Sequence, residues 1–338
     1  MMKLFQWRYG LLLLPVMLWL SVNSAHADIT CEASMNNSIV NISNTITPSN
    51  ANDASIEQTL TYSCTNTSDV TQWASICIGV DGGSNGTSQI NPRHMIGRNG
   101  SRLNFNMTLN GMSNATWGNR TVGGEEFIDF FSVAPGTTPT IKTTVIRVSL
   151  LPNNETAKAD KYTATFADVN TALTYVAVDS SSDTKQCSLE PQGTSSFSFE
   201  VQATVINECK INTTSNIDLR SHPASTTQVT GSNNQAIDMT CTNGALYNIG
   251  LSPSNENTEG QGVMGDTGNN NYQLPYKLHS NPTGTVWGNN GNTYDALTNG
   301  VKGAGNGTAQ LHTVYVTVPN SDVRPAHYSD TVTVHVNY

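Results

Sequence analysis

The sequence predicts an all-β protein made of two tandem β-sandwich domains, and three observations lead to this prediction. Short stretches of alternating apolar and polar residues recur along the chain, for example at 103–109 and 328–338, which is the pattern of half-buried strands. Gly, Asn and Pro residues separate these stretches, and no segment sustains a helical period. The same landmarks also occur twice in the same order, which indicates a duplicated sandwich.

The first 27 residues predict a secretory signal peptide that does not belong to the fold. Lys3 and Arg8 form a positive region, and an apolar core runs from 11 to 20. Residues 25–27 (Ala-His-Ala) fit a small-residue cleavage site, so we expect the mature chain to start at Asp28. The apolar core is too short to span a membrane. An exported protein is therefore expected.

The charge of the mature chain excludes some classes of partner. Without Lys3 and Arg8, 14 of the 16 basic residues remain against 25 acidic residues, a net charge of −11. A negative chain of this kind is a poor match for nucleic acid or for an anionic membrane. We therefore expect no nucleic-acid partner.

Five landmarks define the repeated unit. They are a strand around a cysteine (59–66 and 236–243), a methionine before a glycine (94–97 and 263–265), an alternating strand (103–109 and 272–278), a Trp-Gly-Asn turn (116–119 and 286–289) and a strand ending in Pro-Asn (143–153 and 312–320), each followed by a tyrosine, Tyr162 or Tyr328. A stretch rich in Pro, Gly and Ser at 188–197 predicts the boundary between the units. The expected parts are a signal peptide at 1–27, an N-terminal domain at 28–190 and a C-terminal domain at 191–338, which opens with the strand at 197–205.

The six cysteines predict three disulfides. Cys31 and Cys64 are 33 residues apart, Cys209 and Cys241 are 32 apart, and both pairs occupy equivalent places in the repeat. Subtraction leaves Cys77 with Cys187. An exported chain permits disulfides, and the absence of a C-x-x-C pair disfavours zinc or redox chemistry.

The second unit is expected to be one strand short. After Tyr162 the first unit continues into a further strand at 171–178, whereas after Tyr328 the second has one strand only. We expect that strand to border an unfilled groove through Val332, Val334, Val336 and Tyr338. A donor strand that buries about five apolar side chains would contribute roughly 1.5–3 kcal/mol for each. The sum is comparable to the stability of a whole domain, so the edge should accept a strand from another chain.

Several motifs resemble one known family. "ICIG" (76–79), "HMIG" (94–97), "LNFNMTL" (103–109), the two "WGN" turns and above all "TVYVTVPNSDVRPAHYSDTVTVHVNY" (313–338) resemble the spore coat protein U domain family, whose members are subunits of archaic chaperone–usher pili. The resemblance covers the mature chain twice over. It implies immunoglobulin-like domains, with an incomplete pilin domain at the C-terminus and a surface- or receptor-binding domain at the N-terminus.

The resemblance also implies partners and a location. The expected partners are a periplasmic pilus chaperone before assembly, an outer-membrane usher, an adjacent pilin subunit that donates a strand, and an abiotic or host surface, with no cofactor. Between Asp28 and Cys31 the chain has only Ile29 and Thr30, too few for a donor strand of about ten residues. We therefore expect the chain to reach the cell surface through the periplasm and to stand at the pilus tip as an adhesin, rather than inside the fibre as an interior pilin.

No catalytic or metal site is expected. "GGSNG" (82–86) fits G-x-S-x-G formally, but it lies in a turn-rich run without the strand and helix that a hydrolase elbow needs. The histidines have no metal-ligand spacing, and "GDTGNNN" (265–271) lacks the acidic ligands of a calcium loop. A secreted enzyme therefore stays the disfavoured alternative.

Apolar residues that occur in the first unit alone are the candidates for surface binding. They are Trp73 and the cluster Phe127, Ile128, Phe130, Phe131 and Val133, with Met112 and Leu151 next in line. The cluster is either an additional core strand or an exposed apolar loop. For the mode of attachment to surfaces and biofilm formation we favour exposed apolar loops over a sugar-binding pocket, because exposed apolar patches mark binding sites. The alternative is a lectin pocket with an aromatic platform.

Overall fold

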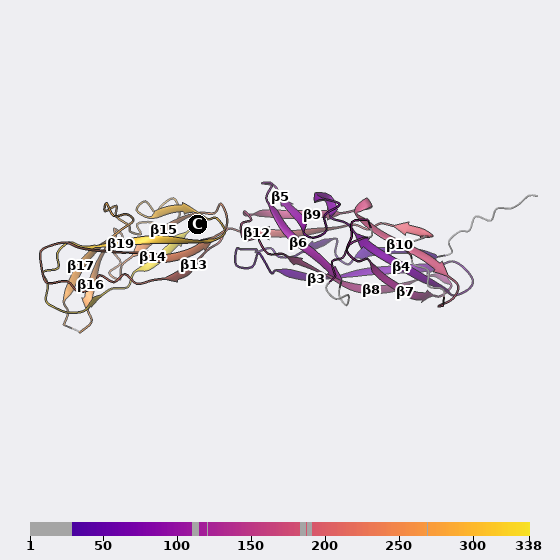
Figure 1. Ribbon diagram of the computed structural model, residues 1–338, viewed down its shortest axis with the longest axis horizontal. Helices are drawn as coiled ribbons and strands as arrows, with labels where there is room; N and C mark the ends of the chain where they lie inside the picture. The colour runs from indigo at the N-terminus through magenta and orange to yellow at the C-terminus, as the bar shows by residue number, and fades with distance from the viewer. Residues whose placement is uncertain (1–28, 110–114, 120, 183–186, 188–190, 269) are drawn as a thin grey trace, which may run out of the picture.

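The computed structural model describes residues 29–109, 115–119, 121–182, 187, 191–268 and 270–338. Two β-sandwiches follow one another along the chain, with two short 3₁₀ turns, η1 (Gly83–Asn85) and η2 (Asp168–Asn170), as the helical elements of the described part (Figure 1). The expected signal peptide and Met112 lie outside the described residues. In the described part of the chain, no helix is long and apolar enough to cross a membrane.

The first domain packs an eight-stranded sheet against a four-stranded sheet. The larger sheet has the order β1 (Ile29–Met35), β3 (Ser55–Asn66), β8 (Gly136–Leu150), β6 (Arg102–Leu109), β5 (Arg93–Gly97), β9 (Asp160–Phe166), β12 (Phe199–Val205) and β2 (Ile39–Asn41). The smaller sheet has the order β11 (Gly193–Ser195), β10 (Thr171–Val178), β4 (Gln72–Val80) and β7 (Phe127–Val133). Their facing side chains form one core around Trp117, Phe105 and Phe166.

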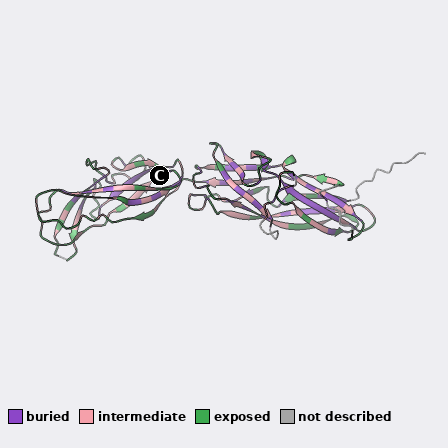
Figure 2. Cartoon of the chain, viewed as in Figure 1, coloured by how far each residue is buried: buried purple, intermediate pink, exposed green. Residues whose placement is uncertain are grey.

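The second domain is a smaller version of the same sandwich. A six-stranded sheet has the order β13 (Cys209–Thr214), β14 (Val229–Cys241), β19 (Ala309–Val318), β17 (Gln273–His279), β16 (Gln261–Asp266) and β20 (Tyr328–Ser329). It faces a three-stranded sheet of β18 (Val301–Ala304), β15 (Leu246–Ser252) and β21 (Thr333–Asn337). Buried residues gather on the strands of both domains, which shows two separate cores (Figure 2).

The duplicated landmarks occupy equivalent places in the two sandwiches. The Trp117 indole Nε1 donates to the carbonyl of Ile78 at 2.9 Å, and that of Trp287 to Ile249 at 2.7 Å. Both rings are fully buried. The tryptophans that recur in both units therefore have a packing role.

All three predicted disulfides are confirmed. Cys31–Cys64 joins β1 to β3, and Cys209–Cys241 joins β13 to β14 in the same way. Cys77–Cys187 ties β4 to the segment that follows β10. Each bridge closes within one domain.

The predicted boundary at 190/191 is wrong, because the strand at 197–205 belongs to the first domain. β12 pairs antiparallel with β9 and parallel with β2, and β11 pairs antiparallel with β10. Phe199, Val201, Ala203 and Val205 alternate into the first core and are all buried. The stretch at 188–197 thus precedes the last strand of the first domain, and the second domain begins at Cys209.

The structure also corrects which strand the second domain lacks. Leu173 on β10 pairs with Ile78, and Val336 on β21 pairs with the equivalent Ile249. The strand at 171–178 therefore has a counterpart, and η2 is a three-residue insertion between β9 and β10. The strands without a counterpart among the described residues of the second domain are β2, β11 and β12.

Candidate functional sites

Within the described residues, the second domain leaves one edge of its sheets uncovered. The equivalent edge of the first domain is covered by further strands. In the first domain β9 lies between β5 and β12, and β10 lies between β4 and β11. In the second domain β20 pairs only with β16 and β21 only with β15, counting the strands of the described residues. We call β20 and β21 the open edge.

Side chains at the open edge and on the strands next to it are less buried than their equivalents in the first domain. Met95, Leu103 and Tyr162 of the first domain are fully buried, whereas Met264, Leu274 and Tyr328 are partly exposed. The other apolar residues that pack against the second core and are only partly buried include Ile217, Leu219, Val332, Val334 and Val336. Tyr338, the last residue predicted for this edge, is 58% exposed. Part of the second core is therefore in contact with solvent.

Strand β12 shows what kind of segment such an edge takes. In the first domain Phe199 pairs with Phe166, Val201 with Ala164 and Ala203 with Tyr162. The rings of Phe199 and Phe166 stack at 4.8 Å between centroids. An extended segment with apolar side chains at alternate positions thus completes the ladder with its backbone and the core with its side chains.

One polar pair lies at the open edge. The hydroxyl of Tyr276, a buried residue of β17, donates to Oδ2 of Asp330 at 2.6 Å. Burial raises the pKa of Tyr276, and the hydrogen bond to Asp330 raises it further. The hydroxyl therefore stays protonated and keeps donating. Phe105 holds the equivalent place on β6, so this pair belongs to the second domain alone.

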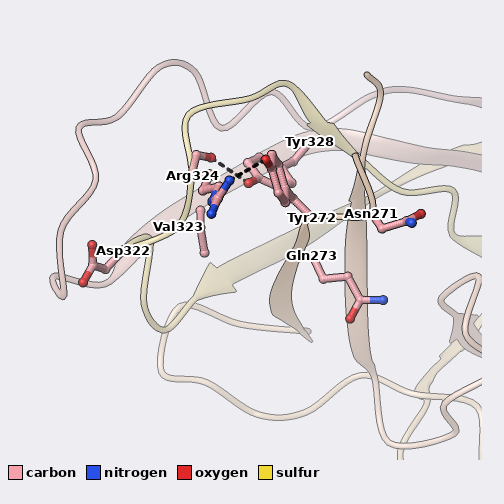
Figure 3. A pocket seen from close by; sticks show the side chains of 7 residues that line it. All are labelled: Asn271, Tyr272, Gln273, Asp322, Val323, Arg324 and Tyr328. Carbon is pink, nitrogen blue, oxygen red and sulfur yellow. Dashed lines mark hydrogen bonds between the residues drawn. The ribbon is translucent and has the colours of Figure 1, made fainter. Parts of the chain in front are cut away.

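An open hollow of about 580 Å³ lies beside Tyr328, where the open edge begins. The guanidinium of Arg324 stands over the Tyr272 ring, and its Nη1 donates to the Tyr272 hydroxyl at 2.9 Å (Figure 3). The Tyr328 hydroxyl donates to the Arg324 carbonyl at 2.7 Å, while Asp322 points away from this group.

The segment 127–133 of the first domain is a strand, so the prediction of an exposed apolar loop is wrong. β7 pairs with β4 along its whole length. Phe131 and Val133 are buried in the core, and Phe127 packs against it. Ile128 and Phe130 point the other way. The apparent lack of alternation arises because both sides of this strand carry apolar residues.

The outward side of the same sheet carries a small aromatic group. Trp73 and Phe130 stack at 5.2 Å between centroids with 18° between their planes, and both are partly exposed. Ile128 is 55% exposed. Cys77 pairs with Ile128, which places Ile128 on the same side as Trp73. We call Trp73, Ile128 and Phe130 the outer apolar face; β4 and β7 lie in the half of the domain away from the second domain (Figure 1).

Leu151 lies elsewhere. It lines a hollow of about 300 Å³ with Pro92, Asn104 and the two residues that follow it. The same segment continues to Thr156, which contacts the second domain. Leu151 is therefore not part of the outer apolar face.

Sequence reasoning missed Arg93, which is fully buried. Its guanidinium donates to the carbonyls of Asp81 at 2.8 Å and Trp117 at 2.5 Å, and more weakly to those of Val80 and Ile90. Burial lowers the pKa of Arg93 to about 9, against the opposing attraction of Asp81. No sequence pattern predicted the burial of Arg93, since a single arginine in a strand is ordinarily exposed.

The segment that fits G-x-S-x-G is a turn. Gly83 donates its backbone N–H to Oδ1 of Asp81 at 2.7 Å at the start of η1. Among the described residues, no group of three His, Cys, Asp or Glu side chains could hold a metal ion.

The sequence profile of the spore coat protein U domain matches residues 18–168 and 194–335. The chain belongs to this family. No curated protein sequence matches it. Among solved structures, it is similar to the CsuE tip adhesion subunit of Acinetobacter baumannii Csu pili, in a pre-assembly complex with the chaperone CsuC (16% identity, 91% of this chain and 100% of that chain, TM-score 0.49). The CupB6 tip adhesin of Pseudomonas aeruginosa matches at 10% identity over 90% and 94% of the chains, with a TM-score of 0.36. Neither similarity is high enough to assign a function.

The limits of the second family match differ from those of the folded domain. The match begins at 194, so the spore coat protein U unit includes β12. In the fold, β12 completes the first sandwich. The second unit therefore starts with the strand that fills the domain before it.

Proposed function

We propose that this protein is the tip adhesin of an archaic chaperone–usher pilus and mediates attachment to surfaces and biofilm formation. Its second domain accepts a strand at the open edge, and its first domain binds the surface. The observation that carries the proposal is the position of β12: a family unit starts with the strand that completes its neighbour. A further unit of the same family would complete the second domain in the same way.

The open edge supplies both contacts that strand addition needs. The unpaired sides of β20 and β21 offer backbone N–H and C=O groups, and the partly exposed core residues Val332, Val334 and Val336 offer apolar area. A periplasmic chaperone would cover this edge first. At the outer-membrane usher the chaperone would be replaced by an adjacent pilin subunit, which would occupy the edge in the fibre. The equivalent place in the first domain is already filled by β12 of the same chain, so the first domain needs no strand from another subunit. This supports a place at the tip.

A chain that carries its own donor tests strand acceptance. We extend the mature protein after Tyr338 by a flexible Gly/Ser linker and a copy of residues 193–205. Burial of the three large side chains of that copy, Phe199, Val201 and Val205, should stabilise the second domain by roughly 5–9 kcal/mol at most. Thermal unfolding followed by calorimetry measures this. The control carries Val201→Asp in the copy. Equal melting of all three chains would refute strand acceptance.

A second prediction concerns the outer apolar face. Replacing Trp73 and Phe130 by Ser removes two partly exposed rings, so attachment to a hydrophobic surface should fall by about tenfold or more. Attachment of purified protein is measured by surface plasmon resonance on an alkyl-coated chip. Ile141→Ser is the matched control, because Ile141 is 63% exposed on the other sheet. Unchanged attachment with intact folding would move the binding surface elsewhere.

A further inference from the structure

A short linker that is held by hydrogen bonds joins the two domains. Three residues separate β12 from β13. The Thr242 hydroxyl donates to the carbonyl of Ile206 at 2.9 Å and accepts the backbone N–H of Glu208 at 3.1 Å. Thr242 is fully buried. The strand that completes the first domain is thus attached to the second domain with little slack.

One segment of the first domain, residues 155–158, contacts the folded part of the second domain. Asn243 Nδ2 donates to the carbonyl of Thr156 at 2.6 Å, and Asn243 forms a parallel bridge with Lys158. Gly307, at φ +82°, packs so closely on Glu155 that a Cβ there would come within 2.1 Å of its carbonyl oxygen. The contact is therefore made by an asparagine on a turn and by a glycine beside it.

The second domain repeats the receiving segment. The Tyr162 hydroxyl donates to the Lys158 carbonyl at 2.7 Å, and the Tyr328 hydroxyl donates to the Arg324 carbonyl at 2.7 Å. Each carbonyl lies four residues before its tyrosine, so 155–158 corresponds to 321–324. Ala157 is buried, whereas its counterpart Val323 is partly exposed and lines the open hollow of Figure 3.

The direction in which β12 runs determines where the rest of a strand-donating subunit would lie, namely beside residues 321–324. Ala203 pairs with Tyr162, and β12 ends two residues later at Val205. A strand of the same polarity on β20 would leave the open edge just beyond Tyr328. With a linker as short as 206–208, the body that follows has to lie against the hollow.

We propose that residues 321–324 and Tyr272 form a docking surface for the body of the subunit that donates the strand. This inference rests on the proposed function. The occupant is a family member that presents a side-chain amide on a turn, as Asn243 does, to the carbonyl of Asp322, with a glycine beside it. The contact within this chain is thereby repeated between subunits.

Two extended chains test the docking surface. The first is the strand-extended protein described above. In the second, the copy continues from 193 to 338, followed by the linker and a further copy of 193–205 that completes the last domain. Val323→Cys in the original domain reports coverage of the hollow through its rate of labelling by a maleimide. The strand-extended chain should label at least about tenfold faster than the body-extended chain, because docking protects the thiol.

The substitution Asn243→Ala in the appended body removes the amide and should restore fast labelling. The same substitution at the original Asn243 is the matched control and should leave the labelling slow. Equal rates in the two extended chains, or slow labelling that Asn243→Ala in the appended body leaves intact, would overturn the docking surface. Failure of the strand extension to raise the melting temperature would instead refute strand acceptance itself.

Discussion

Val201→Asp in the full-length chain should unfold the first domain while leaving the second domain as it is. Val201 is fully buried and pairs with Ala164 of β9. An unpaired carboxylate at this point removes an apolar side chain from the core and exposes β9, so the expected loss is about 4 kcal/mol or more, the range of the severe core substitutions. Calorimetry of the two domains measures the loss. Glu200→Ala on the same strand is the control and should change stability by less than about 0.5 kcal/mol.

The same strand predicts where the first domain can be cut. A chain that ends at 190 lacks β11 and β12, and it should fail to fold. A chain that ends at 208 retains both strands and should unfold cooperatively. Cooperative folding of the shorter chain would show that β12 is dispensable and would remove the main support for strand acceptance.

Arg93→Ala should destabilise the first domain by about 3–5 kcal/mol, because buried carbonyls lose their hydrogen-bond donors and a cavity remains. The side chain is fully buried and bonds the carbonyls of Asp81 and Trp117, which belong to separate loops. With its pKa lowered to about 9, the guanidinium is still charged at neutral pH. Removing it therefore loses charge-assisted hydrogen bonds.

Urea unfolding of the full chain measures this loss. Arg102→Ala is the control, since Arg102 is exposed on the neighbouring strand β6 and should change stability by less than about 0.5 kcal/mol. A loss of similar size for both variants would show that the buried hydrogen bonds of Arg93 contribute little.

The binding candidates show how far a local pattern reaches. Trp73 and Phe130 were predictable as residues peculiar to the first domain, and they do lie side by side. Phe131 and Val133 were predicted with them but face the core. The sequence shows two apolar sides of a strand in one run of letters, and only the position of the second sheet decides which side is covered.

The sequence by itself determined the features that repeat at fixed spacing. The equivalent pairs Cys31–Cys64 and Cys209–Cys241, and the equivalent Trp117 and Trp287, follow from the duplication, because equal spacing in equal strands places equal contacts. The all-β class follows from local alternation and turn residues. Each of these features depends on residues within one unit.

Only the tertiary structure decided to which domain the strand at 199–205 belongs. The alternation of apolar and polar residues predicts that one side of this strand is buried, but it does not indicate which of the two cores contains that side. Both sandwiches have a place for such a strand, and the first one holds it through β9 and β2. Strand pairing joins residues that are distant along the chain, so its partners are chosen by the packing of the whole domain. That choice leaves β20 and β21 uncovered within the described residues.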